Sequence, residues 1–217
     1  MSRAVDDVRV GSHHLPGLLG IPAEPIGLVI FAHGSGSGRF SPRNNHVASA
    51  LREHHIATLL VDLLTEIEEQ DRHNVFDIML LASRLQSVAE WSRQQPGLKE
   101  LPIGYFGAST GAAAALVAAA APNIKISAIV SRGGRPDLAR DAIALVRAPT
   151  LLLIGSLDEQ VIALNQRAFG ELVAPKKIQI IPGAGHLFEE PGTLDQVIRH
   201  ATDWFSSHFV QDRAREA

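Results

Sequence analysis

Six short runs of Val, Ile, Leu and Phe recur along the chain, and they limit the folds that it can adopt. The runs occupy residues 27–32, 56–62, 103–106, 126–130, 150–154 and 177–181. Most are almost continuously apolar rather than alternating, which is typical of strands covered on both faces of a parallel sheet. Segments with helical spacing separate them, and we expect helices over 41–55, 74–95, 110–121, 136–146, 160–173 and 193–208.

This alternation of strands and helices predicts an α/β fold, with a mostly parallel central sheet and helices on both faces. The first 25 residues are expected to add one or two short edge strands around Pro16 and Pro22. No linker divides the chain, so we expect residues 1–217 to form a single domain, in which the polar stretch 210–217 is a frayed tail.

Composition and charge exclude several functions. Hydrophobic residues make up 46% of the chain and charged residues 20%, which is typical of a packed globule. The net charge of −3 gives no electrostatic reason to expect nucleic acid or a membrane as a partner. The absence of cysteine excludes disulfides, thiolate metal sites and a cysteine nucleophile. We find neither a signal-peptide pattern nor a membrane-spanning run, so we expect a cytoplasmic protein.

Residues 107–111 are Gly-Ala-Ser-Thr-Gly and fit the pattern G-x-S-x-G, with Ser109 at its centre. The pentapeptide alone also fits an ordinary glycine-rich turn with a solvated serine. Here it lies where an apolar run meets an alanine-rich helix, and small residues two positions either side of the serine suit a sharp strand-to-helix turn. Such a turn lifts the hydroxyl clear of the sheet, so this context favours Ser109 as a nucleophile.

A serine nucleophile needs a base to take its proton and a carboxylate to orient that base. Asp158 and His186 each follow a later apolar run, which gives the order Ser, Asp, His of α/β-hydrolases. We therefore expect Asp158 and His186 to complete a triad with Ser109. Asp158 could instead cap the next helix, Asp62 and Asp137 are other candidates for the acid, and His186 could be a structural histidine.

A second glycine-rich stretch, "FAHGSGSGRFSPRN", covers residues 31–44. It follows a predicted strand and precedes a predicted helix, as a dinucleotide-binding turn does. Its spacing is G-x-G-x-G rather than G-x-G-x-x-G, although Asp62 ends the next strand and keeps that interpretation open. A Walker loop is excluded because Arg39, and not lysine, follows the last glycine.

In a hydrolase the same stretch would supply a donor to the oxyanion hole. The backbone amide of Ser35 is expected to act there together with the backbone amide of Thr110. His33 precedes the loop and is expected to be a scaffold residue rather than a base.

Four arginines, Arg39, Arg43, Arg132 and Arg135, fall near predicted strand ends. A guanidinium is a planar fork that suits a carboxylate, so one of them could select an anionic ester. Alternatively they cap helices or pair with nearby acidic residues such as Asp137 or Glu66. Arg132 is the best candidate for a substrate contact because it follows the strand beside that of the nucleophile, and Arg39 is a second candidate.

The stretches "HGSGSGRFSPRN", "GASTGAAAAL", "GSLDEQV" and "GAGHLFEEPG" resemble small α/β-hydrolases of the dienelactone-hydrolase-like group. The resemblance covers nearly the whole chain and implies an α/β-hydrolase fold with little or no cap. It also implies a mechanism without metal or cofactor. Dienelactone hydrolase itself uses a cysteine nucleophile, which this chain lacks, so the expectation shifts toward general carboxylesterase chemistry.

These features together predict a serine carboxylesterase that cleaves small or short-acyl esters through an acyl-enzyme. The longest candidate lid, residues 63–76, is short and acidic, and we expect an exposed loop or a solvated helix start there. Transfer of the acyl group to another acceptor, perhydrolysis, and a ligand-binding role without turnover would all use the same residues. The physiological substrate and the oligomeric state stay open.

Overall fold

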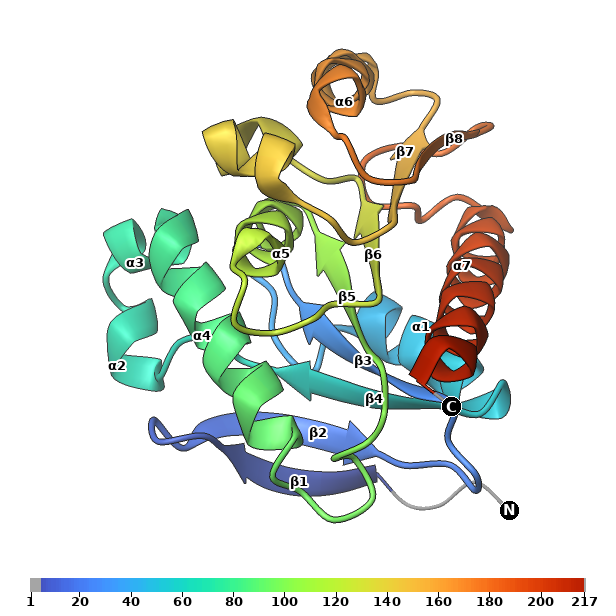
Figure 1. Cartoon of the computed structure of the whole chain (residues 1–217). Helices are drawn as coiled ribbons and strands as arrows, with labels where there is room; N and C mark the ends of the chain where they lie inside the picture. The colour runs from blue at the N-terminus through green and yellow to red at the C-terminus, as the bar shows by residue number, and fades with distance from the viewer. Residues whose placement is uncertain (1–4, 217) are drawn as a thin grey trace.

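Eight strands form one sheet in the computed structural model, which describes residues 5–216. The strands are β1 (Val5–Val10), β2 (Leu15–Gly20), β3 (Gly27–Ala32), β4 (Ile56–Val61), β5 (Ile103–Ala108), β6 (Ala128–Arg132), β7 (Thr150–Gly155) and β8 (Lys176–Ile181). Their order across the sheet is β1-β2-β4-β3-β5-β6-β7-β8. β1 and β2 pair antiparallel at one edge, and the strands from β4 to β8 run parallel (Figure 1).

The strand order reverses at β3, which lies between β4 and β5. The chain leaves β3 toward β4 on one side and returns to β5 on the other. Open α/β sheets bind their ligands at such a switch point, at the carboxyl ends of the strands. The loops that follow β3 and β5 carry the glycine-rich stretch and Ser109, so the topology brings these two segments together.

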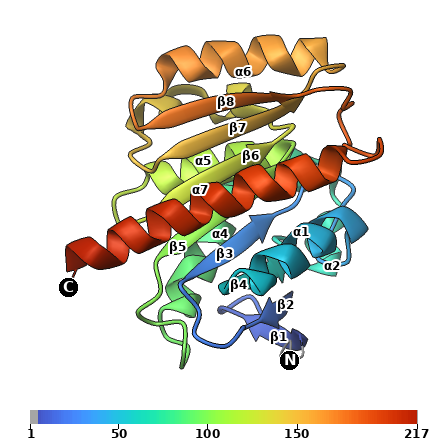
Figure 2. The ribbon, with the colours of Figure 1, turned by 90° about the vertical axis from the view of Figure 1, so that its right-hand side faces the viewer.

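Helices cover both faces of the sheet (Figures 1 and 2). The helices are α1 (Pro42–Glu53), α2 (Glu66–Glu69), α3 (Arg72–Phe76), α4 (Ile78–Ser92), α5 (Thr110–Ala120), the 3-10 segment η1 (Pro136–Leu145), α6 (Glu159–Glu171) and α7 (Thr193–Glu216). The helices α1 and α7 pack on one face, and α4, α5, η1 and α6 pack on the other. In β3, Leu28 and Ile30 face the α4–α5 side, whereas Val29 and Phe31 face α1 and α7. Burial on both sides explains why the runs are continuously apolar.

The expected α/β architecture, with a mostly parallel sheet and helices on both faces, is confirmed, and the first 25 residues contain the edge strands β1 and β2. Three details of the prediction are wrong. Residues 136–145 form a 3-10 segment that is interrupted at Arg140, whose φ of 48° breaks the helical path. The helix expected over 74–95 begins at Ile78, because the Asp77 side chain caps it by accepting from the Leu80 amide.

The third correction concerns the C-terminal stretch. Residues 210–216 continue α7 and are not a frayed tail, whereas Ala217 lies outside the described residues. Phe209 is fully buried against the sheet, and the Asp212 carboxylate accepts a hydrogen bond from the Ser127 hydroxyl at 2.5 Å. These contacts hold the last turns of α7 in place. Within residues 5–216, no helix has the length and apolar character needed to cross a bilayer.

Removing the Phe209 ring is expected to destabilise the protein by about 3–5 kcal/mol, because it leaves a cavity between α7 and the sheet. The adjacent Val210 is 57% exposed, so Val210→Ala is the matched control and should change the free energy of unfolding by less than about 0.5 kcal/mol. Urea denaturation of Phe209→Ala and Val210→Ala measures both values. Equal stability of the two variants would contradict the placement of α7.

Candidate active site

Ser109 occupies a strained turn between β5 and α5. Its φ of 51° and ψ of −120° are unusual for a residue with a side chain, and its carbonyl accepts hydrogen bonds from the amides of Ala112 and Arg135 at 3.1 Å each. The amide of Ser109 donates to the carbonyl of Arg132 on the neighbouring strand at 3.3 Å. A strained turn between a strand and a helix is the geometry that G-x-S-x-G predicts for a nucleophile.

Glycines beside this turn allow an unusually close approach of backbones. A Cβ placed on Gly111 would lie 2.1 Å from the carbonyl oxygen of Ala32 at the end of β3. A Cβ on Gly107 would lie 2.4 Å from the Cα of Ala112. Both distances are far below van der Waals contact, so only glycine fits at either position.

His186 and Asp158 form a hydrogen-bonded pair. His186 lies in the loop after β8, Asp158 follows β7, and the His186 Nδ1 atom is 2.6 Å from the Asp158 Oδ2 atom. Asp158 lies at the N-cap position of α6, yet its side chain makes no capping hydrogen bond to this helix. Its carboxylate therefore orients the imidazole rather than the helix. When Nδ1 donates to Asp158, Nε2 carries the lone pair that a general base needs.

Ser109 and His186 line the same cavity, which has a volume of about 800 Å³. Across the part of the chain that the structure describes, no hydrogen bond joins the two side chains directly. Gly133 follows the strand beside that of the serine, and a Cβ on it would lie 3.6 Å from the Cε1 atom of His186. The imidazole thus lies above the end of β6, next to the turn that carries Ser109. Catalytic hydrogen bonds are often long in unliganded enzymes.

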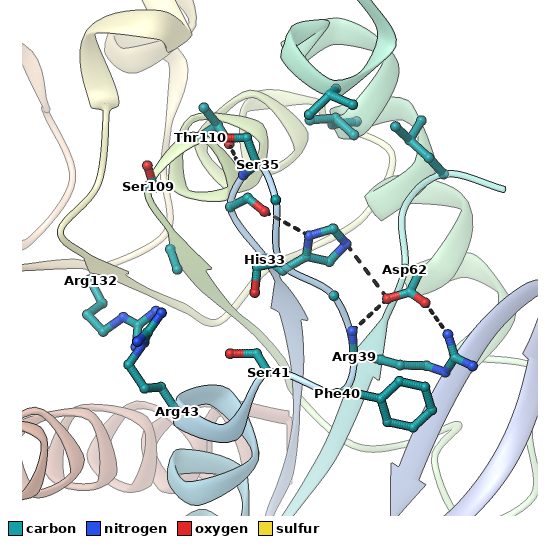
Figure 3. A pocket seen from close by; sticks show the side chains of 18 of the residues that line it. His33, Ser35, Arg39, Phe40, Ser41, Arg43, Asp62, Ser109, Thr110 and Arg132 are labelled. Carbon is teal, nitrogen blue, oxygen red and sulfur yellow. Dashed lines mark hydrogen bonds and ion pairs between the residues drawn. The ribbon is translucent and has the colours of Figure 1, made fainter. Parts of the chain in front are cut away.

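The glycine-rich loop after β3 packs directly against the serine. A Cβ on Gly34 would lie 3.0 Å from the Cβ of Ser109. The amide of Ser35 donates to the Thr110 hydroxyl at 3.1 Å (Figure 3). Thr110 is the first residue of α5, so its own amide has no carbonyl partner within the helix. The two amides expected to form an oxyanion hole are therefore brought to one place.

Asp62 anchors this loop and does not contact His186 in any described hydrogen bond or ion pair. Its carboxylate accepts from the amide of Arg39 at 2.6 Å and forms an ion pair with the Arg39 guanidinium (Figure 3). The Nδ1–H group of His33 donates to the carbonyl of Gly34 at 3.0 Å, and its Nε2 atom is 3.9 Å from the Asp62 Oδ1 atom. Asp62 and His33 thus serve the loop scaffold.

Three of the four arginines near strand ends pair with carboxylates: Arg39 with Asp62, Arg43 with Glu189, and Arg135 with Asp137. Arg132 differs from them. It is 8% exposed, and its Nη1 atom is enclosed without a hydrogen-bond partner among the described residues. Burial is the main cause, and the charge of Arg43 a smaller one, that lowers the pKa of Arg132 to about 10. At neutral pH its guanidinium is therefore charged.

Sequence reasoning missed Glu190, which holds the histidine loop, since its Oε1 atom accepts from the amide of Gly185 at 3.0 Å. Residues 63–76, expected to be an exposed loop or a solvated helix start, form the short helices α2 and α3, and Leu64, Glu69 and Val75 from this stretch line the cavity. The signal for α2 was present in the sequence, because Thr65 and Glu68 form a capping box.

Comparison with solved structures places the chain in a family. A dienelactone hydrolase from Anabaena variabilis is 51% identical, with a TM-score of 0.90 over 94% of this chain and 96% of that one. The chain belongs to the dienelactone hydrolase family. No family model matches the sequence. Est1E from Butyrivibrio proteoclasticus shares the α/β-hydrolase fold with this chain. It is 16% identical, with a TM-score of 0.79 over 95% of this chain and 99% of its own.

A curated relative carries a different name. A Mycobacterium tuberculosis protein named "Putative phosphoribosyl transferase" is 55% identical over 205 residues, which are 94% of this chain and 46% of that protein. The chain thus spans about half the length of the curated relative that it matches. This chain has the fold of the dienelactone hydrolase from Anabaena variabilis, and the transferase name belongs to a protein about twice as long as this chain.

The close approach at Gly111 predicts a large effect of one methyl group. Gly111→Ala is expected to destabilise the protein by about 3 kcal/mol, because the new Cβ would displace the end of β3. Gly170 lies in α6, where a Cβ would meet no described atom within 4 Å, so Gly170→Ala should instead stabilise the protein, by up to about 1 kcal/mol. Thermal melting of both variants measures the difference. A Gly111→Ala variant as stable as the parent would contradict this packing.

Proposed function

We propose that the chain is a serine-dependent carboxylesterase that cleaves small or short-acyl esters through an acyl-enzyme. The observation that carries the proposal is the 2.6 Å pair of His186 and Asp158 beside a cavity that also exposes the strained Ser109 turn. Nucleophile, base and acid come from three separate strand ends, as the α/β-hydrolase order requires. Membership of the dienelactone hydrolase family supports hydrolysis as the reaction class.

In this mechanism the Ser109 hydroxyl attacks an ester carbonyl while Nε2 of His186 accepts its proton. Asp158 steadies the imidazolium that results. The tetrahedral intermediate collapses to an acyl-enzyme and expels the alcohol, which takes the proton back from His186. Water then attacks the acyl-enzyme with His186 as base and releases the acid.

The negative oxygen of the intermediate would be held by the amides of Ser35 and Thr110. The Ser35 amide donates to the Thr110 hydroxyl in the resting protein, so the oxyanion would replace that hydroxyl as its acceptor. A charged oxygen is a stronger acceptor than a neutral hydroxyl, so the exchange favours the intermediate over the ground state.

Other uses of the same residues differ in their acceptor or turnover. Acyl transfer to another nucleophile and perhydrolysis would proceed through the same acyl-enzyme. A ligand-binding role without turnover would show slow acylation of Ser109 and no release of product. Mass spectrometry of the protein after incubation with an aryl ester separates that role from an esterase.

A fluorophosphonate probe is expected to label Ser109, and Ser109→Ala should abolish the label together with ester hydrolysis. The folded structure should persist, because the substitution removes only a hydroxyl. Ser83 is exposed on α4, so Ser83→Ala is the matched control and should keep full labelling. Labelling that survives in Ser109→Ala would refute the assignment of the nucleophile.

Short acyl chains should be preferred, because the cavity wall combines apolar side chains with polar groups. Apolar side chains, among them Leu64, Val75 and Leu81, line it together with the polar glycine-rich loop, and the short helices α2 and α3 border it between β4 and α4. We therefore expect kcat/KM for acetyl or butyryl p-nitrophenyl esters to exceed that for the palmitoyl ester at least about tenfold. A preference for the palmitoyl ester would contradict this part of the proposal.

A further inference from the structure

Arg132 is a buried charge without a counter-charge in the described part of the chain. It ends β6 opposite Ala108, so its backbone lies one strand away from the nucleophile turn. Its side chain lines the catalytic cavity, and within residues 5–216 no carboxylate forms an ion pair or hydrogen bond with its guanidinium. The ring of Phe106 lies 6.0 Å from its Cζ atom, at the outer limit of a useful cation–π contact. Such burial is costly unless a partner compensates it.

A second guanidinium lines the same cavity. Arg43 extends from the start of α1 (Figure 3), and its positive charge contributes to lowering the pKa of Arg132. Arg43 pairs with Glu189, whose side chain is 61% exposed at the surface. Among the residues that the structure describes, the Arg43 Nε atom has no hydrogen-bond partner, as is the case for Nη1 of Arg132. The positive charge of Arg43 adds repulsion to the cost of burying Arg132, and an anion bound by both residues would relieve both.

The N-terminus of α1 opens onto the same wall. Ser41 is the N-cap of this helix of 12 residues, and Ser41, Pro42 and Arg43 all line the cavity. The amide of Arg43 lies in the first turn, where amides have no partner within the helix and the helix dipole is positive. The first turn of α1 and both guanidinium groups thus belong to residues that line the same cavity as Ser109.

We propose that Arg132, Arg43 and the first turn of α1 form an anion subsite that binds a phosphate monoester group carried by the ester substrate. This inference rests on the proposed esterase function and names its substrate class. The anion would sit beside the scissile ester and would take no part in bond breaking. Arg132 is then a specificity-determining residue.

The number and arrangement of donors favour phosphate over carboxylate. A carboxylate has two oxygens and one negative charge, which a single guanidinium fork satisfies. A phosphate monoester has three terminal oxygens and nearly two charges at neutral pH, so it can bond to two guanidinium groups and a helix amide together. Glu189 lies at the exposed end of Arg43 and can turn into solvent when the anion enters.

Direct binding tests the subsite without relying on catalysis. Calorimetry of the Ser109→Ala protein at constant ionic strength should detect inorganic phosphate, with weaker binding of acetate. Adding Arg132→Gln should weaken phosphate binding at least about tenfold, because it removes charge-assisted hydrogen bonds. Arg147 is exposed and lies outside this cavity, so Arg147→Gln is the matched control and should bind phosphate as the parent does.

Kinetics then connect the subsite to the substrate. Three aryl acetates share one scissile bond: 4-acetoxyphenyl phosphate, 4-acetoxybenzoate and 4-methoxyphenyl acetate. In Arg132→Gln, kcat/KM for the phosphate ester is expected to fall at least about 30-fold more than that for the neutral ester. Arg132→Lys keeps the charge without the fork and should recover part of the loss. Melting temperature provides a further readout, since Arg132→Gln removes an uncompensated charge and should not lower it.

The outcomes separate the subsite from the esterase. If phosphate binding depends on Arg132 but none of the aryl acetates is cleaved and Ser109 is not labelled, the subsite stands and the esterase proposal fails. If the aryl acetates are cleaved but phosphate binds equally to the parent and to Arg132→Gln, the subsite is refuted while the esterase proposal stands. Tighter binding of acetate than of phosphate, or a large fall in melting temperature in Arg132→Gln, would also overturn the assignment.

Discussion

The contact between the Ser109 turn and the end of β3 is the constraint on which the site depends. Gly111 lets the first turn of α5 lie against the Ala32 carbonyl, and Gly34 lets the next loop lie against Ser109 itself. These approaches bring the expected nucleophile and both expected oxyanion donors to the switch point of the sheet. A side chain at Gly111 would push α5 away from β3 and separate them. The same packing holds the strained backbone of Ser109 in place.

Most charged side chains around the cavity hold loops or side chains in position, whereas Arg132 has no such structural role among the residues described. Asp62 with Arg39 fixes the glycine-rich loop, and Asp158 fixes His186. Each of these carboxylates has a partner that explains its position. Arg132 has no such partner within residues 5–216, and a buried charge lowers stability unless a partner compensates it. Sites that work on charged ligands tolerate such a cost, because the ligand supplies the missing counter-charge.

The sequence predicted the strands and the residues at their ends well, because continuous apolar runs and motif order depend on local pattern. It failed where tertiary contacts decide. The polar stretch after residue 209 has the composition of a loose tail, yet Phe209 and Asp212 tie it to the sheet. The order of strands favoured Arg132 over Arg39, but it could not predict how either residue pairs, since only the fold shows that Asp62 reaches Arg39 and that no described carboxylate reaches Arg132. The break of η1 at Arg140 likewise could not be predicted, because neither glycine nor proline lies at that position.

The hydrogen bond from Ser35 to Thr110 bears on how the resting site is kept ready. Ser35 is exposed on a loop that is only partly buried, so without this contact the loop could adopt other conformations in which water satisfies the amide. The Thr110 hydroxyl holds the amide where the oxyanion is expected to form. It accepts only as a neutral oxygen, so in the proposed mechanism a charged oxygen would displace it. The same contact would then fix the loop in the resting protein and leave the amide available to the proposed intermediate, which is the preorganisation that electrostatic catalysis requires.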